Sequence, residues 1–343
     1  MRNSRRRSLA LVLAAALLAA ACGGDSDDDG AAASAASAAT TPETTVAPAT
    51  TAAPTTEAPG PLPITVIDAR GVEVVIESTE RILPLDGDVA EVVFALGLGD
   101  QVVATDISAT FPPEADALPE IGYQRALSAE PIIEFAPTVV LGTDLAGPPE
   151  TIESLEAVGI PVVIVPSETT PDGPAIKIEA VANALGVPEV GARLAGEVNT
   201  AIDAATVGPA TGPDAPRVVA LYIRGTNVQL VLGEESGIGW LLDAAGAVDI
   251  ADELGVIDAE PISAEAIVLA APDVIVVPEL GLESVGGVEG LMEIPGLAET
   301  PAGENGAVLS YDDQLMLGNG PRTGEFLAEL VDDLNAATSG ATE

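Results

Sequence analysis

The residue types that most often carry out catalysis are scarce in this sequence. The chain contains no histidine, so imidazole is missing both as a general base and as the commonest metal ligand. Its single cysteine, Cys22, can form neither an internal disulfide nor a thiolate metal cluster. Acidic residues, 54 in total, are spread along the chain, so no carboxylate pair is singled out for acid–base chemistry. The side chains therefore predict that this protein is not an enzyme.

The glycine-rich stretches lack the partners that nucleotide-binding loops and hydrolases require. Gly97-Leu98-Gly99 has no third glycine of a dinucleotide fingerprint, residues 318–323 have no P-loop lysine, and no Gly-x-Ser-x-Gly elbow occurs. The formal net charge of −42, with Lys177 as the only lysine, predicts a surface that repels nucleic acid. We expect a binding protein with no nucleic acid partner and no catalytic cofactor. A lipid-anchored adhesion or signalling module is an alternative at this point.

The first 60 residues are typical of an exported and tethered protein. Four arginines precede an apolar run, Leu9–Ala21, which has the length of a signal peptide and is too short for a convincing transmembrane span. The small residues before Cys22 resemble the lipobox of bacterial lipoproteins, although Leu18 stands four residues before the cysteine instead of the usual three. We predict a lipoprotein signal peptide over 1–21, lipidation of Cys22, and a disordered Ala/Thr/Pro-rich tether over 22–60. An ordinary signal peptide with an incidental cysteine is the alternative.

One short pattern occurs twice in the remaining sequence, 135 residues apart. Ser128-Ala129-Glu130 and Ser263-Ala264-Glu265 are each followed, at the same spacing, by an isoleucine, an Ala-Pro pair and a β-branched run. A Ser-x-Glu before an apolar turn predicts a helix cap, and the proline predicts the start of a buried strand. A helix–loop–strand unit repeated at this distance predicts two similar α/β lobes with a cleft between them.

The rest of the pattern supports this organisation, because β-rich and helical stretches alternate and so favour mostly parallel sheets. Strands are predicted over 64–76 (as a hairpin), 81–85, 102–105, 139–141, 162–165, 218–223, 274–277 and 307–310, and helices over 89–96, 152–158, 188–205, 240–245 and 324–334. We expect an α/β protein of two Rossmann-like lobes joined by a single long α-helix, with the ligand cleft between the lobes. The predicted boundaries are 61–185 for the N-terminal lobe, 186–206 for the linking helix and 207–340 for the C-terminal lobe.

Five phrases in this part of the chain carry a resemblance to a known family. They are Leu-Asp-Gly-Asp-Val-Ala-Glu (85–91), Gly-Tyr-Gln-Arg-Ala-Leu-Ser-Ala-Glu (122–130), Leu-Tyr-Ile-Arg-Gly (221–225), Pro-Gly-Leu with Thr-Pro-Ala-Gly (295–303), and Gly-Asn-Gly-Pro-Arg-Thr (318–323). The chain resembles the helix-linked solute-binding lipoproteins that serve ABC importers of cobalamin, iron–siderophores and haem, and it is most similar to the haem-binding members.

The resemblance implies a function, a cellular location and binding partners. It implies a receptor that is lipid-anchored to the bacterial cytoplasmic membrane on its outer side, captures ferric haem and delivers it to a permease dimer. A receptor for a ferric siderophore or cobalamin is the alternative. It also implies that Glu130 and Glu265 dock against arginines of the permease, where two like charges on two lobes suit a two-fold symmetric partner. Both residues are equally suited to be helix N-terminal glutamates that serve only the helix.

The resemblance further implies that Tyr222 ligates the iron and that Arg224 assists it. Residues two apart on a strand share a face, and phenolate is a hard donor that favours ferric iron. The guanidinium is expected to hydrogen-bond the phenolate and to lower the pKa of Tyr222 from its usual value near 10. A Tyr and an Arg at a strand end, with no metal, is the alternative.

The second axial ligand is left open, because many of these relatives use a histidine from the other lobe and this chain has none. The iron could be five-coordinate, or the sixth position could be taken by water, Met292, Met316 or Tyr123. Alternatively, the ligand is not haem. Arg125 and Arg322 are candidate partners for propionates or other acidic groups of the ligand, with salt bridges to protein carboxylates as the alternative.

Overall fold

The computed structural model describes residues 60–212, 215–261 and 263–339. All of them belong to one compact unit, Ala53–Glu343. The predicted signal peptide, Cys22 and the predicted tether up to residue 59 lie outside the described residues. Within the described part, no helix has the length and hydrophobicity needed to cross a membrane.

The N-terminal lobe is built on a small parallel sheet in the order β3-β4-β5. Side chains alternate along these strands between two apolar clusters, so that Ile82 and Leu83, for example, face opposite cores. Such a sheet is buried on both faces, which explains its continuous apolar runs. Its elements are β1 (Ile64–Ile67) and β2 (Glu73–Ile76), which form a hairpin, β3 (Ile82–Pro84), β4 (Val139–Gly142), β5 (Val162–Ile164), α1 (Gly87–Ala95), η1 (Gly99–Gln101), α2 (Pro113–Asp116), η2 (Gln124–Ala126), α3 (Ala129–Glu134), α4 (Pro149–Ala157) and α5 (Gly173–Ala184).

The C-terminal lobe has a larger, mixed sheet. Its order is β11-β10-β6-β7-β9, with β8 also beside β6; β10 and β8 run parallel to β6, and β7 runs antiparallel to it. The expectation of mostly parallel pairing is confirmed, and β7 and β9 are the antiparallel exceptions within this sheet. The elements are β6 (Arg217–Arg224), β7 (Val228–Leu232), β8 (Val248–Asp249), β9 (Ala259–Glu260), β10 (Val274–Pro278), β11 (Val308–Tyr311), η3 (Glu234–Ser236), α7 (Gly239–Ala244), α8 (Ile250–Leu254), α9 (Ala264–Ala270), α10 (Glu279–Ser284), α11 (Gly287–Leu291), α12 (Pro301–Asn305), α13 (Asp313–Leu317) and α14 (Thr323–Ser339).

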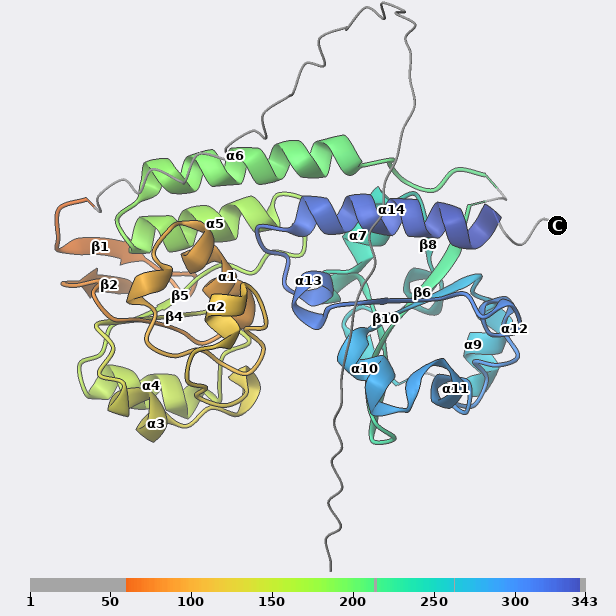
Figure 1. Ribbon diagram of the computed structural model, residues 1–343, viewed down its shortest axis with the longest axis horizontal. Helices are drawn as coiled ribbons and strands as arrows, with labels where there is room; N and C mark the ends of the chain where they lie inside the picture. The colour runs from red at the N-terminus through yellow and green to blue at the C-terminus, as the bar shows by residue number, and fades with distance from the viewer. Residues whose placement is uncertain (1–59, 213–214, 262, 340–343) are drawn as a thin grey trace, which may run out of the picture. The chain divides into compact units, whose positions relative to one another are not determined.

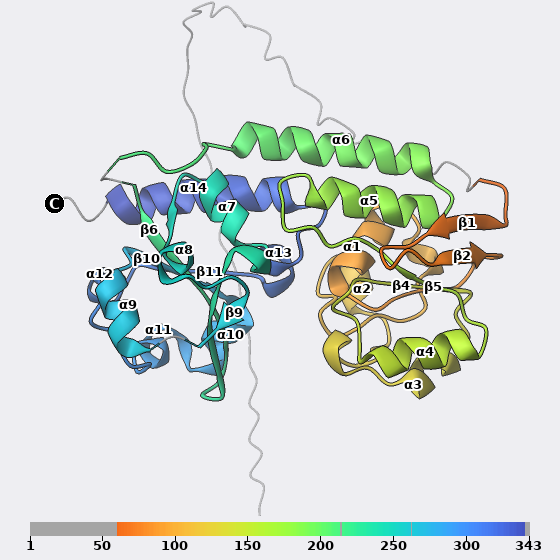
Figure 2. The same ribbon diagram turned by 180° about the vertical axis from the view of Figure 1, so that it is seen from behind.

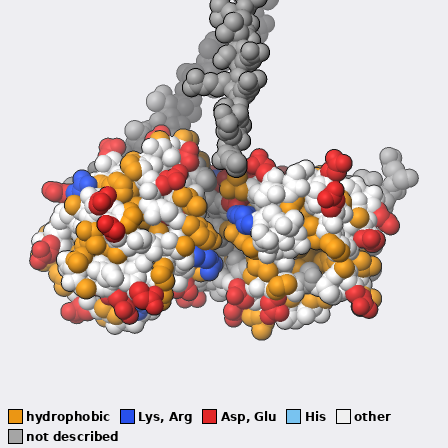
Figure 3. Space-filling model, turned by 90° about the horizontal axis from the view of Figure 1, so that it is seen from below, with side chains coloured by type: hydrophobic (Ala, Val, Ile, Leu, Met, Phe, Trp, Pro, Cys, Tyr) orange, Lys and Arg blue, Asp and Glu red, His pale blue; other side chains and the backbone are white. Residues whose placement is uncertain are grey.

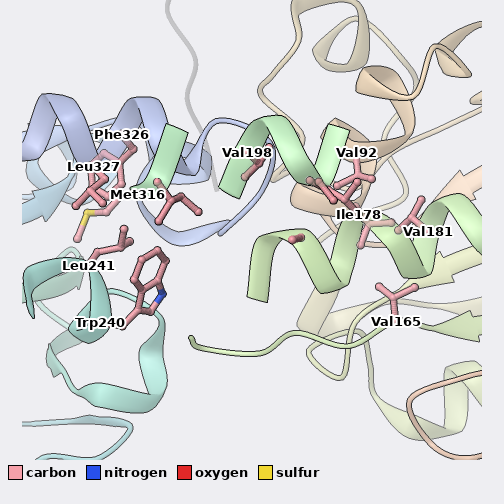
Figure 4. Packing of buried hydrophobic residues seen from close by; sticks show 14 of the residues in the cluster. Val92, Val165, Ile178, Val181, Val198, Trp240, Leu241, Met316, Phe326 and Leu327 are labelled. Carbon is pink, nitrogen blue, oxygen red and sulfur yellow. The ribbon is translucent and has the colours of Figure 1, made fainter. Parts of the chain in front are cut away.

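A single long helix, α6 (Pro188–Ala205), joins the two lobes and has the bounds predicted for a helix there. It packs against α5 of the first lobe and α14 of the second, and Figures 1 and 2 show it lying along both. One apolar cluster continues through both lobes beneath it, from Ile178 on α5 through Val198 on α6 to Phe326 on α14 (Figure 4). The shared core makes the connection a packed interface and not a free linker.

The repeated sequence pattern is also a repeated backbone. In each copy a helix (α3 or α9) is followed within two residues by an alanine with positive φ, Ala136 (44°) or Ala271 (47°), and then by a proline and a buried strand. The predicted cap forms in the second copy, where the Ser263 hydroxyl accepts a hydrogen bond from the backbone of Ala266. The Ser128 side chain makes no such bond. The predicted strand over 102–105 is reduced to two isolated bridges, and the helix α5 was not predicted.

Candidate functional site at the groove between the lobes

A groove separates the two lobes, and basic side chains lie on both of its walls (Figure 3). Tyr222 and Arg224 reach this region from the C-terminal end of β6, where the pairing with β7 ends. Since they are two residues apart on a strand, their side chains share a face, as predicted. Both are half-buried, so they are held by neighbours while remaining open to a ligand.

Arg224 is held by neighbouring residues of its own lobe. Its guanidinium lies 4.4 Å from the centre of the Tyr222 ring and donates to the Ile223 carbonyl oxygen at 2.8 Å. It also forms an ion pair with Asp313 at the start of α13, and the other oxygen of Asp313 accepts from the backbone of Leu280. Asp313 therefore fixes the guanidinium above the ring. No sequence signal pointed to this role, since Asp313 is one of 54 acidic residues.

The phenol of Tyr222 differs from its expected state. Burial raises its pKa above 10, and the Tyr123 hydroxyl and the Asp313 carboxylate raise it further, while the charge of Arg224 lowers it. The expectation of a lowered pKa is therefore wrong, because desolvation of the phenol outweighs the nearby charge of Arg224.

Tyr123, on the N-terminal lobe, lies close enough to Tyr222 on the C-terminal lobe to raise the pKa of its phenol. Tyr123 directly precedes η2, and its ring is 36% exposed. The loop that carries it is fixed from behind, because the Gln124 carbonyl oxygen accepts from the backbone of Gly147 at 2.7 Å. Each lobe thus contributes one phenol to this region.

Arg125 lies in the same turn as Tyr123 and is exposed. Within the described residues, none of the ion pairs includes Arg125. Its guanidinium therefore has no carboxylate partner in the described part of the chain, and its predicted role as a partner for an acidic group of a ligand stays a prediction.

Arg322 is in a different position from Arg125. Its guanidinium binds both oxygens of the buried Glu91 on α1, each at 2.9 Å, and stacks 3.7 Å above the ring of Phe111. Burial raises the pKa of Glu91, and the ion pair with Arg322 works against that shift. Arg322 therefore joins the two lobes, and its charge is already neutralised. This pairing corresponds to the salt-bridge alternative for Arg322.

Two further residues complete this contact between the lobes. Gln314 on α13 donates to the Gly87 carbonyl oxygen and to Glu91, both at 2.9 Å, and accepts from the backbone of Phe111. Lys177 on α5 is only 2% exposed, pairs with Asp88, and donates to the Gly318 carbonyl oxygen at 2.8 Å. We call these the hinge contacts: Lys177 with Asp88 and Gly318, Arg322 with Glu91, and Gln314.

The two methionines that were considered as iron ligands lie in apolar clusters. Met316 is fully buried in the core shared by the lobes (Figure 4), and Met292 packs against the second core of the C-terminal lobe. The Met316 alternative is therefore wrong. Glu130 and Glu265, by contrast, are both exposed in the first turns of α3 and α9.

Two α/β lobes, one long connecting helix and a groove between the lobes define the class of two-lobed solute-binding proteins. Residues 82–315 match the periplasmic binding protein family, and this chain belongs to that family. It is a solute-binding protein of an ABC importer and not an enzyme.

Individual relatives differ in how much of the chain they match. The periplasmic haem-binding protein RhuT from a Roseiflexus species, in its apo form, is 45% identical with a TM-score of 0.72, over 76% of this chain and 100% of that chain. An uncharacterised ABC transporter substrate-binding lipoprotein of Bacillus subtilis, YvrC, is 24% identical over 79% of this chain and 85% of its own length. The vitamin B12-binding protein of Vibrio campbellii is 29% identical over 36% of this chain. The match spans less than half of that protein, 45% of its length.

Proposed function

We propose that this protein captures ferric haem outside the cytoplasmic membrane and delivers it to the permease dimer of an ABC importer. The observation that carries the proposal is the pair Tyr222 and Arg224, which faces Tyr123 across the groove of a body 45% identical to a haem-binding protein. A flat iron macrocycle suits a groove that offers phenol oxygens from its walls and a guanidinium at its edge.

Each residue has a physical role in this proposal. Tyr222 gives up its proton and binds the iron, and the nearby charge of Arg224 stabilises the resulting phenolate. Asp313 keeps Arg224 above the ring, so the guanidinium pays little entropy on binding. Arg125 pairs with a propionate at the mouth of the groove. Arg322 is not included in this set, since Glu91 already holds it.

A titration of the purified protein with ferric haem, a ferric siderophore and cobalamin tests this function. We expect haem to bind tightest and to show the absorbance band of charge transfer from a phenolate to ferric iron. Tyr222→Phe should remove most of that band. Tyr311→Phe is the matched control, because Tyr311 is buried in the core and donates to Asp333. Tight binding of only the siderophore or cobalamin would contradict the haem assignment.

Cobalamin or a ferric siderophore is the second candidate ligand. Partial similarity to vitamin B12-binding proteins and the absence of histidine from the sequence favour it. In that case Tyr222, Tyr123 and the arginines would line the groove without ligating a metal. The same titration separates the two candidates.

The anchor and the docking residues belong to the same proposal. Similarity to the lipoprotein YvrC supports lipidation of Cys22 and a location on the outer side of the cytoplasmic membrane. Exposure of Glu130 and Glu265 at matching positions of the repeat supports docking to arginines of the permease. Replacing both glutamates by lysine should leave haem binding intact and abolish uptake by cells, whereas persistent uptake would contradict the docking role.

A further inference from the structure

Two exposed leucines occupy matching positions of the structural repeat. The offset of 135 residues continues past the strands β4 and β10, where Asp144-Leu145 matches Glu279-Leu280. Leu145 is 40% exposed and Leu280 is 52% exposed, although leucine is among the residues most often buried. Each lobe therefore presents one exposed leucine just beyond the C-terminal end of a buried strand.

Leu280, in the first turn of α10, lies beside Tyr222 and Arg224. Strand β10 runs parallel to β6, so the residues that follow the two strands lie at the same edge of the sheet. The backbone of Leu280 donates to Asp313, whose other oxygen holds Arg224. A methyl group added to Gly281 would come within 2.9 Å of the backbone of β6, so α10 packs directly against that strand. Figures 1 and 2 show α10 on the side of its lobe that faces the other lobe.

Leu145 lies in the loop that leads from β4 to α4, next to the turn that carries Tyr123 and Arg125. The two segments are joined by a backbone hydrogen bond, in which Gly147 donates to the Gln124 carbonyl oxygen at 2.7 Å. Leu145 therefore belongs to the same wall of the groove as Tyr123, and Leu280 belongs to the wall that carries Tyr222.

The leucines suit a different part of a ligand from the part that Tyr222 suits. A phenol oxygen binds a metal or a hydrogen-bonding group, whereas a leucine side chain offers only apolar surface. A porphyrin has two broad apolar faces whether or not it contains a metal, and covering them removes apolar area from water. A siderophore, which surrounds its iron with polar oxygen atoms, gains much less from such contacts.

We propose that Leu145 and Leu280 pack against the apolar surface of a porphyrin from the two walls of the groove, and that this receptor therefore binds metal-free porphyrin as well as ferric haem. The inference rests on the proposed function and adds a second ligand to the same site. Ligation by Tyr222 adds affinity for ferric iron to the contacts that the ring makes. No covalent bond forms or breaks when the metal-free ring binds.

The first experiment measures the affinity of the purified protein for ferric haem, by absorbance, and for metal-free protoporphyrin IX, by its fluorescence. We expect the metal-free ring to bind about 10–100-fold more weakly than haem, since it lacks the bond to the phenolate. Tyr222→Phe should reduce the difference between the two ligands to less than about threefold, because it removes the contact that only haem can make.

The second experiment replaces the leucines by asparagine, which is of similar size and has a polar end. Leu145→Asn and Leu280→Asn should each weaken binding of both ligands about fivefold, and the double variant about 25-fold. The loss should be equal for the two ligands, because a leucine contacts the ring and not the metal. Val158→Asn combined with Leu269→Asn is the matched control, since these residues are at least as exposed, lie one on each lobe and are not among the groove contacts described above.

The outcomes separate this inference from the proposed function. Failure of the wild type to bind ferric haem would overturn the proposed function, whatever the metal-free ring does. Tight binding of haem without measurable binding of protoporphyrin IX would overturn only this inference, and this comparison needs no variant. A double leucine variant that binds both ligands as tightly as the control would overturn it as well. Circular dichroism establishes that each variant is folded.

Discussion

The two lobes meet in two regions whose polar side chains differ sharply in burial. At the hinge contacts, Lys177 is 2% exposed, and Arg322 is bound through two hydrogen bonds to a buried glutamate. At the groove, Arg224 and Tyr123 are each about a third exposed, and Arg125 is exposed more fully. The chain has 12 basic and 54 acidic residues, so a basic residue that is not paired with a carboxylate is unusual. The comparison teaches that burial and pairing, and not residue type, separate the arginines that hold the lobes from those that can hold a ligand.

The hinge contacts should dominate stability. Lys177→Met removes the charge that compensates Asp88 and leaves a largely buried carboxylate unpaired. We expect the free energy of unfolding, measured with urea, to fall by about 3–5 kcal/mol. The double variant Lys177→Met with Asp88→Asn should recover part of this loss, because the uncompensated charge is then removed too. A loss below about 1 kcal/mol would mean that the ion pair contributes no more than a surface pair.

Arg322 tests this difference between the hinge contacts and the groove. It was predicted to bind an acidic group of the ligand, and in the structure it is paired with Glu91. Arg322→Met leaves Glu91 buried with only Gln314, and we expect a stability loss of about 3 kcal/mol with haem affinity nearly unchanged. Arg217→Met is the control, because its pair with Glu253 is much more exposed and should contribute about 1 kcal/mol or less. Weaker haem binding at unchanged stability would return Arg322 to the ligand site.

Haem binding at the groove should depend on pH. Burial holds the pKa of Tyr222 above 10, and Arg224, Asp313 and Tyr123 are the groups that act on it. Ligation requires the phenolate, so haem binding releases protons and strengthens as pH rises. The one proton released from Tyr222 makes the association constant about tenfold larger per pH unit. Titrations between pH 6.5 and 8.5 should show this slope in the wild type and lose it in Tyr222→Phe, whereas an equal slope in both would contradict ligation by Tyr222.

The sequence predicted the parts of the fold that depend on local pattern. The linking helix has one apolar face and a proline at its start, so its bounds could be predicted, and the repeat identified α3, β4, α9 and β10. Helix α5 was missed because eight of its twelve residues are buried, including Lys177, which leaves no simple apolar stripe. The antiparallel strand β7, which lies between β6 and β9, was missed as well, since its first three residues are only half-buried.

The sequence was enough to select candidate residues for the site, but it could not predict which side chains these residues would be paired with. Tyr222, Arg224 and Tyr123 could be selected because the sequence resembles a family with a known ligand pattern. The partners that decide their chemistry are distant in sequence: Asp313 lies 89 residues from Arg224, and Glu91 lies 231 residues from Arg322. Only the fold brings these groups together, so pairing and burial, and hence the raised pKa of Tyr222, could not be predicted.

Arg125 should show the smallest effect and the one most confined to the groove. Its side chain is exposed and forms no ion pair within the described part of the chain, so Arg125→Gln should leave the free energy of unfolding unchanged within about 0.5 kcal/mol. Loss of its contact to a propionate should weaken haem binding about tenfold, which corresponds to about 1.4 kcal/mol. Arg193→Gln on the exposed face of α6 is the matched control and should change neither quantity. Haem dimethyl ester, which lacks the acidic groups, should bind the wild type and Arg125→Gln equally, and a remaining difference would show that Arg125 acts on the fold of the Tyr123 loop and not on the ligand.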